Sequence, residues 1–125
     1  MRHLFLALLT LAVLVCLDPA ARADEGLVLA GTCSDDGAWD QANLKNLPAK
    51  AVTGPVSTPV DAKVISGLKL REATDGRPLE AKTIGNVKAG STVKVVALRV
   101  MGASPGAAHA VWAKISVEPD RVLKP

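Results

Sequence analysis

The most constraining feature of this sequence is the stretch 83–100, which reads TIGNVKAGSTVKVVALRV. Ile84 and Val87 are apolar positions in a short alternating segment, and a run rich in β-branched residues follows Gly90. Alternation with a period of two and β-branched residues both favour strands, whereas a glycine among small residues favours a turn. The stretch therefore predicts a hairpin of two half-buried strands at the centre of a mainly β fold.

Two basic residues in the second of these strands predict an irregularity. Lys94 and Arg99 should both face water, yet they are five positions apart. Successive side chains of a flat strand point to opposite faces, so this odd spacing would separate the two. We therefore expect a bulge or a sharp bend near Val95 and Val96.

Other short segments have strand character, and turn pairs such as Asp75-Gly76 and Pro105-Gly106 separate them. Residues 110–117 alternate most clearly, and the pattern places Trp112 and Lys114 on one face and the apolar residues Val111, Ala113, Ile115 and Val117 on the other. Several such strands within about sixty residues predict a small, strongly bent β-barrel. We assign residues 62–125 to this barrel.

The preceding segment, 24–61, is predicted to be an arm and a linker. Asp40 could cap a short helix over 41–47, which Pro48 would end. Residues 49–61 contain two prolines, and proline offers no backbone N–H to a sheet. This part is therefore expected to be a surface strap and not a central strand.

Residues 1–23 have the pattern of a secretory signal peptide. A positive start precedes an apolar run over 4–17, and Ala21-Arg22-Ala23 is a small-x-small cleavage signal. The run is too short for a membrane anchor, so we expect a periplasmic or secreted protein, cleaved after Ala23 and without a membrane span. Cys16 could suggest a lipoprotein, but Val15 precedes it where that processing requires a small residue.

Cleavage would leave Cys33 as the one cysteine. It cannot form an internal disulfide, so it is a buried thiol, half of an intermolecular disulfide, or free and reactive. Cys33 and His109 could in principle form a nucleophile–base pair. A hydrolase domain, however, needs on the order of a hundred residues of its own, which the chain outside the barrel does not supply.

Metal and cofactor motifs are weak in this sequence. His109 has no cysteine or acid at ligand spacing, and zinc needs three or four donors. Asp35, Asp36 and Asp40 could hold calcium weakly, but they lack the terminal Glu of a calcium loop, so a solvated turn is favoured. We predict no metal, no cofactor and no catalytic residue, and hence a protein that is not an enzyme.

Charge is distributed unevenly along the chain. Residues 24–60 carry two basic and five acidic side chains, whereas residues 61–125 carry eleven basic and six acidic ones. The basic part could meet an anionic partner or the acidic part of the same chain. Because its cations are spread along strands and not clustered, a solvated strand face is favoured.

Three groups of residues resemble motifs of bacterial Src-homology-3-like (SH3-like) domains. Residues 67–71, GLKLR, are similar to the family's G-L-x-x-R opening. Residues 84–96 are similar to its I-G-x-L-x-x-G-x-x-V-x-V core, and residues 112–115, WAKI, resemble its W-x-K-V strand. The likeness covers residues 64–117. The sequence departs from the family at 118–123, EPDRVL, where a Gly-x-x-Gly-Trp-Val stretch is common. The resemblance implies a barrel-shaped extracytoplasmic module that binds peptidoglycan or peptides, or that acts as an adaptor.

Aromatic residues are scarce, since only Trp39 and Trp112 remain after residue 23. Polyproline grooves, sugar sites and single-stranded nucleic-acid sites all use aromatic platforms, so we expect no nucleic-acid partner. We place the candidate ligand site around Trp112, Arg71 and Arg77, with Trp39 as the second ring.

The sequence thus predicts an exported, non-enzymatic SH3-like binding module whose partner is a protein or the cell wall. One alternative is a secreted inhibitor or an accessory subunit of a larger exported complex, in which the arm 24–61 would extend the partner's surface. The other alternative is the small hydrolase based on Cys33 and His109.

Overall fold

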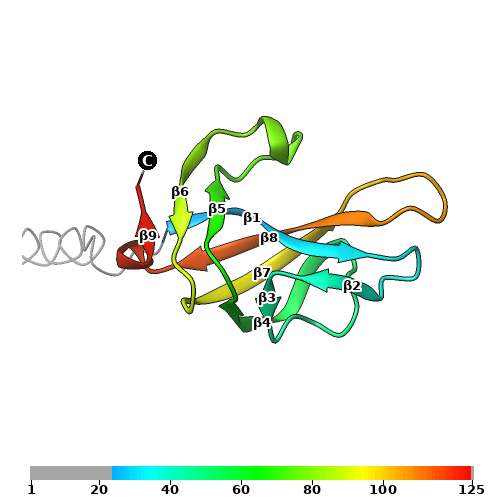
Figure 1. Cartoon of the computed structure of the whole chain (residues 1–125), viewed down its shortest axis with the longest axis horizontal. Helices are drawn as coiled ribbons and strands as arrows, with labels where there is room; N and C mark the ends of the chain where they lie inside the picture. The colour runs from blue at the N-terminus through cyan, green and yellow to red at the C-terminus, as the bar shows by residue number, and fades with distance from the viewer. Residues whose placement is uncertain (1–23, 125) are drawn as a thin grey trace, which may run out of the picture.

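Antiparallel strands make up most of residues 24–124, the part of the chain that this computed structural model describes (Figure 1). The strands are β1 (Asp24–Cys33), β2 (Trp39–Ala42), β3 (Leu44–Lys45), β4 (Gly54–Val64), β5 (Leu68–Arg71), β6 (Thr83–Val87), β7 (Thr92–Val100), β8 (His109–Val117) and β9 (Val122–Leu123). Two 3₁₀ turns, η2 (Pro78–Glu80) and η3 (Pro119–Arg121), accompany them. The mainly β prediction is confirmed. The predicted signal peptide and Cys16 lie outside the described residues.

The sheet is open, so the predicted closed barrel is wrong. Its strand order is β3-β4-β7-β8-β1-β5-β6-β9, with β2 paired to β1 beside this path. The two strands at the ends of this order, β3 and β9, are two residues long each. Pro119 begins a 3₁₀ turn just before β9 and leaves only Val122 and Leu123 to pair with β6. The segment in which the sequence departs from the SH3-like pattern is therefore too short to close a barrel.

Residues 83–100 form two strands as predicted, but these strands do not form a hairpin. β6 pairs with β5 and β9, whereas β7 pairs with β4 and β8. The connection between β6 and β7 bonds instead to the end of β4. The Gly90 N–H donates to the Val64 carbonyl (2.8 Å), and the Val64 N–H donates to the Ser91 carbonyl (2.9 Å). These long-range bonds direct β6 and β7 to different parts of the sheet.

The bulge predicted in the second strand is confirmed. The pairing of β7 with β8 shifts register between Val95 and Ala97, so Val96 is the extra residue. Lys94 pairs with Ser116 and Arg99 pairs with Trp112. Their partners are four positions apart on β8, so both basic side chains lie on the same face of the sheet.

The segment 24–61 is part of the sheet. β1 lies between β8 and β5, and it pairs with β8 from Asp24↔Val117 to Cys33↔His109. The strap prediction for 49–61 is wrong from Gly54 onward, because β4 lies between β3 and β7. The sheet accommodates the prolines through a register shift between Pro55 and Val60.

The predicted helix over 41–47 is also wrong, since β2 and β3 occupy this segment. Asn43 joins the two strands, and its N–H donates to the Ala30 carbonyl on β1 (2.7 Å). The Asn43 carbonyl accepts from the Ile65 N–H (3.1 Å) beyond β4. About seven residues of helix have little stability of their own, so these sheet contacts prevail over the local cap at Asp40.

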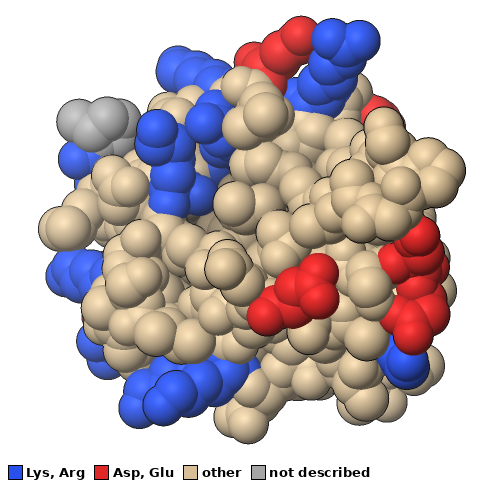
Figure 2. Space-filling view, turned by 45° about the vertical axis from the view of Figure 1, so that its right-hand side comes forward, with Lys and Arg blue, Asp and Glu red and all other residues tan. Residues whose placement is uncertain are grey.

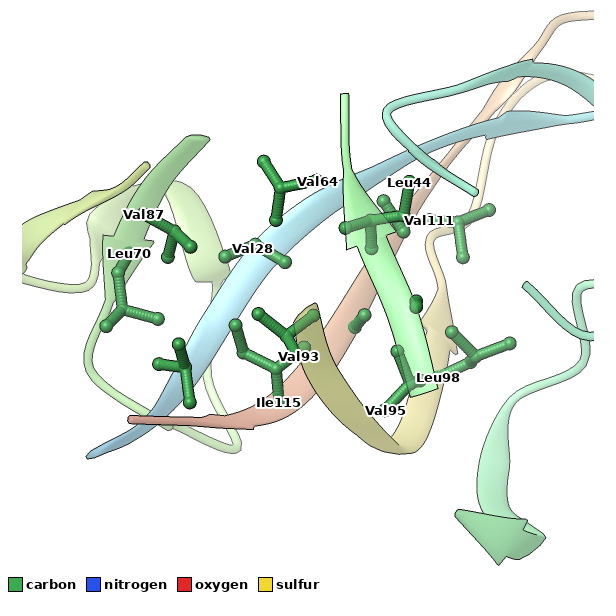
Figure 3. Close-up of a cluster of buried hydrophobic side chains, with 14 of the residues drawn as sticks. Val28, Leu44, Val64, Leu70, Val87, Val93, Val95, Leu98, Val111 and Ile115 are labelled. Carbon is green, nitrogen blue, oxygen red and sulfur yellow. The ribbon is translucent and has the colours of Figure 1, made fainter. Parts of the chain in front are cut away.

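The inner face of the curved sheet holds one hydrophobic core, most of whose members are shown in Figure 3. It contains Val28, Leu44, Val64, Leu70, Val87, Val93, Val95, Leu98, Val111 and Ile115, among others. Full burial of side chains of this size contributes about 1.5–3 kcal/mol each, before the entropy of ordering is subtracted. The face of β8 predicted to be apolar is confirmed as buried. No helix among residues 24–124 is long and apolar enough to cross a membrane.

Candidate functional site

The loop that joins β5 to β6, residues 72–82, lies at the top of Figure 1, and Arg99 on β7 bonds to it. We call it the covering loop. Between this loop and the strands lies a cleft of about 370 Å³. The residues that line the cleft are Leu27, Ala73, Thr74, Asp75, Ala97, Leu98, Arg99, Trp112 and Lys114. Trp112 is 5% exposed and lines the cleft opposite Ala73, Thr74 and Asp75 of the loop.

Strand register explains why these residues meet. Leu27 on β1 pairs with Arg71 on β5 and with Lys114 on β8. Paired residues of neighbouring strands project to the same face, so these three side chains form one row across the outer face. A second row contains Trp112, which pairs with Leu29 on β1 and with Arg99 on β7. The two rows place an indole ring and three cations on the same face.

Two arginines, which we call the arginine anchors, tie the covering loop to the sheet. Arg99 donates through Nη1 to the Gly76 carbonyl and through Nη2 to the Thr74 carbonyl. Arg71 donates through Nη1 to the Ala81 carbonyl (3.0 Å) and less closely to the Leu79 carbonyl (3.3 Å). A guanidinium has five N–H donors, so each anchor can bind the loop and still have donors to spare.

Lys114 differs from the anchors because its ammonium group makes no hydrogen bond or ion pair with residues 24–124. Its side chain is exposed at the edge of the cleft. Asp75 is the one acidic residue in the cleft lining. The lining therefore carries two cations against one anion, and Arg71 adds a third cation beside it.

The structure brings together some of the predicted site residues and separates others. Trp112 lines the cleft, and Arg71 lies in the row next to it. Arg77 lies on the covering loop, where its ion pair with Glu80 (3.5 Å) leaves the two side chains 81% and 71% exposed. Trp39 lies on β2, packs against the core and donates from Nε1 to the Pro48 carbonyl (2.8 Å). Neither Arg77 nor Trp39 lines the cleft.

Three important residues of the cleft, Leu27, Arg99 and Lys114, were absent from the predicted ligand site. The signals for two of them were present in the sequence. Alternation along 110–117 puts Lys114 on the same face as Trp112. The bulge at Val96 brings Arg99 to that face as well. No local pattern pointed to Leu27, because its position depends on pairing between distant strands.

A second group of polar residues lies near the loop between β7 and β8, and we call it the histidine latch: Asp35, His109, Met101 and Gly106. Nε2 of His109 lies 2.7 Å from Oδ1 of Asp35, and Nδ1 lies 2.7 Å from the Met101 carbonyl oxygen. Both partners are acceptors, so both ring nitrogens donate only when the ring is the imidazolium ion. The other Asp35 oxygen accepts from the Gly106 N–H (3.1 Å).

These contacts change the acidity of both residues of the ion pair. The hydrogen bond to Asp35 raises the pKa of His109 above its ordinary 6.5, and the bond to the Met101 carbonyl adds to this shift. The hydrogen bond from His109 lowers the pKa of Asp35 below its ordinary 3.8, with a further contribution from the Gly106 N–H. The latch therefore stabilises the charged forms of both residues relative to the free side chains.

Cys33 pairs with His109 across β1 and β8 and is a free, buried thiol. Burial raises the pKa of this thiol, and the charges of Asp40, Asp36 and Asp35 raise it further. A cysteine nucleophile needs thiolate character and a base with a free nitrogen. Because both nitrogens of His109 are already bonded, this geometry does not suit a nucleophile–base pair.

The acidic turn after β1 satisfies its own polar groups. Asp36 accepts from the hydroxyl of Ser34 and from the Ala38 N–H (3.2 Å). Within residues 24–124, no group of three or more His, Cys, Asp or Glu side chains is placed to hold a metal ion. The aspartates of this turn therefore act as local hydrogen-bond acceptors and in the histidine latch.

The view in Figure 2 shows acidic side chains mainly on the right and basic ones mainly on the left, with uncharged residues between the basic groups. A nucleic-acid surface would present a continuous basic stripe. The face in this view does not present one.

No protein-family model, no curated protein and no solved structure matches this chain. The SH3-like resemblance therefore rests on the motifs of residues 64–117. In the structure these motifs lie on β5, β6, β7 and β8 in chain order. Trp112 of the W-x-K-V motif is the ring that lies in the cleft.

Proposed function

We propose that this protein is an exported, non-enzymatic binding module whose ligand occupies the cleft under the covering loop. The observation that carries the proposal is the cleft itself, where Trp112 and apolar side chains adjoin two cations. Ligand sites commonly combine an apolar lining with a few polar groups that fix orientation. The arginine anchors hold the loop over the sheet, so the cleft exists before a ligand arrives.

The SH3-like likeness supports the same class of function. In this proposal the chain is a variant SH3-like module, whose four central strands carry the family motifs and whose last strand is too short to close the barrel. The pattern of residues 1–23 supports export. The engaged nitrogens of His109 and the raised pKa of Cys33 favour binding over hydrolysis.

An accessory subunit remains the alternative within the binding class. That hypothesis used residues 24–61 as an arm that would extend a partner's surface. In the structure these residues supply β1, β2, β3 and most of β4, so no separate arm is available among them. The cleft consequently has the stronger support as the contact surface.

The test compares how well two variants of residues 24–125 capture a ligand, one with the cleft partly filled and one with the cleft open. Ala97 lines the cleft, so Ala97→Phe should fill part of it. Ala103 is exposed in the loop between β7 and β8, and Ala103→Phe is the matched control. Purified peptidoglycan and an extract of exported proteins serve as the two sources of ligand. We expect Ala97→Phe to abolish capture and Ala103→Phe to retain it.

Equal capture by the two variants would show that the cleft is not the binding surface. Binding to peptidoglycan and capture of an exported protein would distinguish the two partners that the sequence left open. An accessory subunit would stay in the supernatant when peptidoglycan is sedimented. From the extract of exported proteins it would be recovered in a complex with a larger protein. Circular dichroism of both variants checks that the sheet is intact.

A further inference from the structure

We infer that the cleft binds an acidic, apolar-flanked segment of a partner protein, with a carboxylate at Lys114 and Arg99. This inference rests on the proposed function and specifies the chemistry of the ligand. Its first support is charge. Lys114 has no partner among residues 24–124, and its row on the outer face also contains Arg71. The single acid in the lining, Asp75, leaves an excess of positive charge.

The second support is the donor arrangement of Arg99. Its Nη1 and Nη2 atoms each donate to a carbonyl of the covering loop, so the guanidinium is fixed in place against the sheet. Donors that do not contact the loop remain on the same rigid group. Arginine and carboxylate form strong charge-assisted hydrogen bonds, and a fixed guanidinium loses little freedom when it forms one.

The third support separates a peptide from a glycan. A sugar ring binds by stacking on an accessible aromatic face, but Trp112 is only 5% exposed. Leu27, which lies on the same face and also lines the cleft, is buried as well, at 4% exposure. The floor of the cleft can therefore contact a small apolar side chain but cannot act as an open stacking platform. Its volume of about 370 Å³ suits a few side chains of an extended peptide.

Binding of two pools of short peptides to residues 24–125 tests this inference. The first pool alternates Glu with Leu, Val or Phe, and the second pool replaces each Glu with Gln. Binding is followed by NMR through the Trp112 indole N–H and the amides of Thr74 and Lys114. We expect the Glu pool to shift these signals and the Gln pool to bind about tenfold more weakly or not at all. Added salt should weaken the Glu pool's binding, because its charges are partly exposed.

Lys114→Gln should lower the affinity for the Glu pool about fivefold, while Lys114→Arg should largely retain it. Lys63 on β4 is an exposed lysine outside the cleft, so Lys63→Gln is the matched control and should have no effect. Both positions are exposed on the surface of the sheet, so the three variants are expected to fold. Equal binding of both pools, or equal affinities of Lys114→Gln and Lys63→Gln, would overturn the inference.

Soluble peptidoglycan fragments are the third probe in the same NMR experiment. If they shift the signals of the cleft and the Glu pool does not, the acidic-peptide inference fails while the proposed binding function stands. If no probe shifts these signals and Ala97→Phe captures as well as Ala103→Phe, the proposed function fails too. The acidic-peptide inference and the proposed binding function can therefore be rejected separately.

Discussion

The covering loop and the loop between β7 and β8 are both attached to the structure through side-chain hydrogen bonds, but by different chemical groups. The covering loop is held by the guanidinium groups of Arg71 and Arg99, which stay charged at every pH at which proteins are stable. The loop at 101–108 is held by the imidazolium of His109 and the carboxylate of Asp35. The attachment of the covering loop should therefore be constant with pH, whereas that of the loop at 101–108 should weaken as the pH rises through the raised pKa of His109.

The two regions also differ in how closely the backbone is packed. Near the arginine anchors, β1 approaches β5 so closely that a Cβ atom on Gly26 would lie 2.4 Å from the Arg71 carbonyl oxygen. In the loop at 101–108, a Cβ atom on Gly106 would have no heavy atom within 4 Å. The cleft region is thus built on a rigid strand contact, and the latch region on an open loop.

The largest expected effect follows from this difference in packing. Gly26→Ala should lower the free energy of unfolding by about 3 kcal/mol, because β1 and β5 must separate to admit the methyl group. Gly106→Ala should cost about 1 kcal/mol, since only its left-handed backbone, at φ +80°, opposes the substitution. Urea unfolding of the two variants measures both values. Equal losses would show that the two regions are packed alike.

The next effect concerns the arginine anchors. Arg99→Met should lower the free energy of unfolding by about 2 kcal/mol, because two charge-assisted hydrogen bonds to the covering loop are lost. Hydrogen exchange of residues 74–76 should become faster. Arg77→Met on the same loop removes an arginine whose ion pair with Glu80 is exposed, so its effect should be within the error of the measurement. A similar loss from both variants would mean that Arg99 is not an anchor.

The smallest effect is the pH dependence of the histidine latch. The pKa of His109 is raised in the folded state. The contribution of His109 to the free energy of unfolding is therefore complete below its ordinary pKa of 6.5 and is lost as pH rises through the folded pKa. The pKa of Asp35 is lowered, so its contribution is present above 3.8 and is lost as pH falls through the folded pKa. Stability from the latch should therefore be greatest between these two ordinary values.

Unfolding midpoints across this range measure the effect, and His109→Gln should remove the decline on the alkaline side. Cys33 does not interfere there, because the pKa of its thiol is raised above the ordinary 9.0. As the pH rises, the rate of amide hydrogen exchange, corrected for its intrinsic pH dependence, should increase over residues 101–108. The corrected rate over residues 74–76 should stay constant. A parallel change in both loops would contradict the distinction between a titrating and a non-titrating attachment.

The sequence predicted those features that depend on neighbouring residues. Alternation along 110–117 identified the buried face of β8, and the spacing of Lys94 and Arg99 identified the bulge. Strand partners could not be predicted in the same way. β6 and β7 separate because Gly90 and Ser91 bond to Val64, which is distant in the sequence. The helix prediction failed for the same reason, since contacts with β1 outweighed the local cap.

The candidate site was predicted only where strand alternation governed it. Trp112 and Lys114 share a face because of that alternation, although Lys114 was not included in the predicted site. The charge of Arg77 predicts a place in the ligand site, but Arg77 does not line the cleft. The course of the covering loop depends on hydrogen bonds to its carbonyls, which no sequence pattern reveals. The aromatic ring of Trp39 predicts a place in the ligand site as well. In the structure Trp39 packs against the core, and its indole N–H donates to the Pro48 carbonyl. Distant hydrogen bonds thus decide which of the predicted residues meet.

The pairing of β1 with β8 has a consequence for the order of folding. Asp24 faces Val117 in this ladder, so the middle of the sheet joins segments at opposite ends of the described chain. Closing so long a loop costs conformational entropy before any contact compensates for it, and such topologies acquire their structure slowly. Until β8 is available, β1 can pair only along the edge where β2 and β5 lie. A polypeptide that ended before β8 would leave the other edge of its first strand without a neighbour along its whole length.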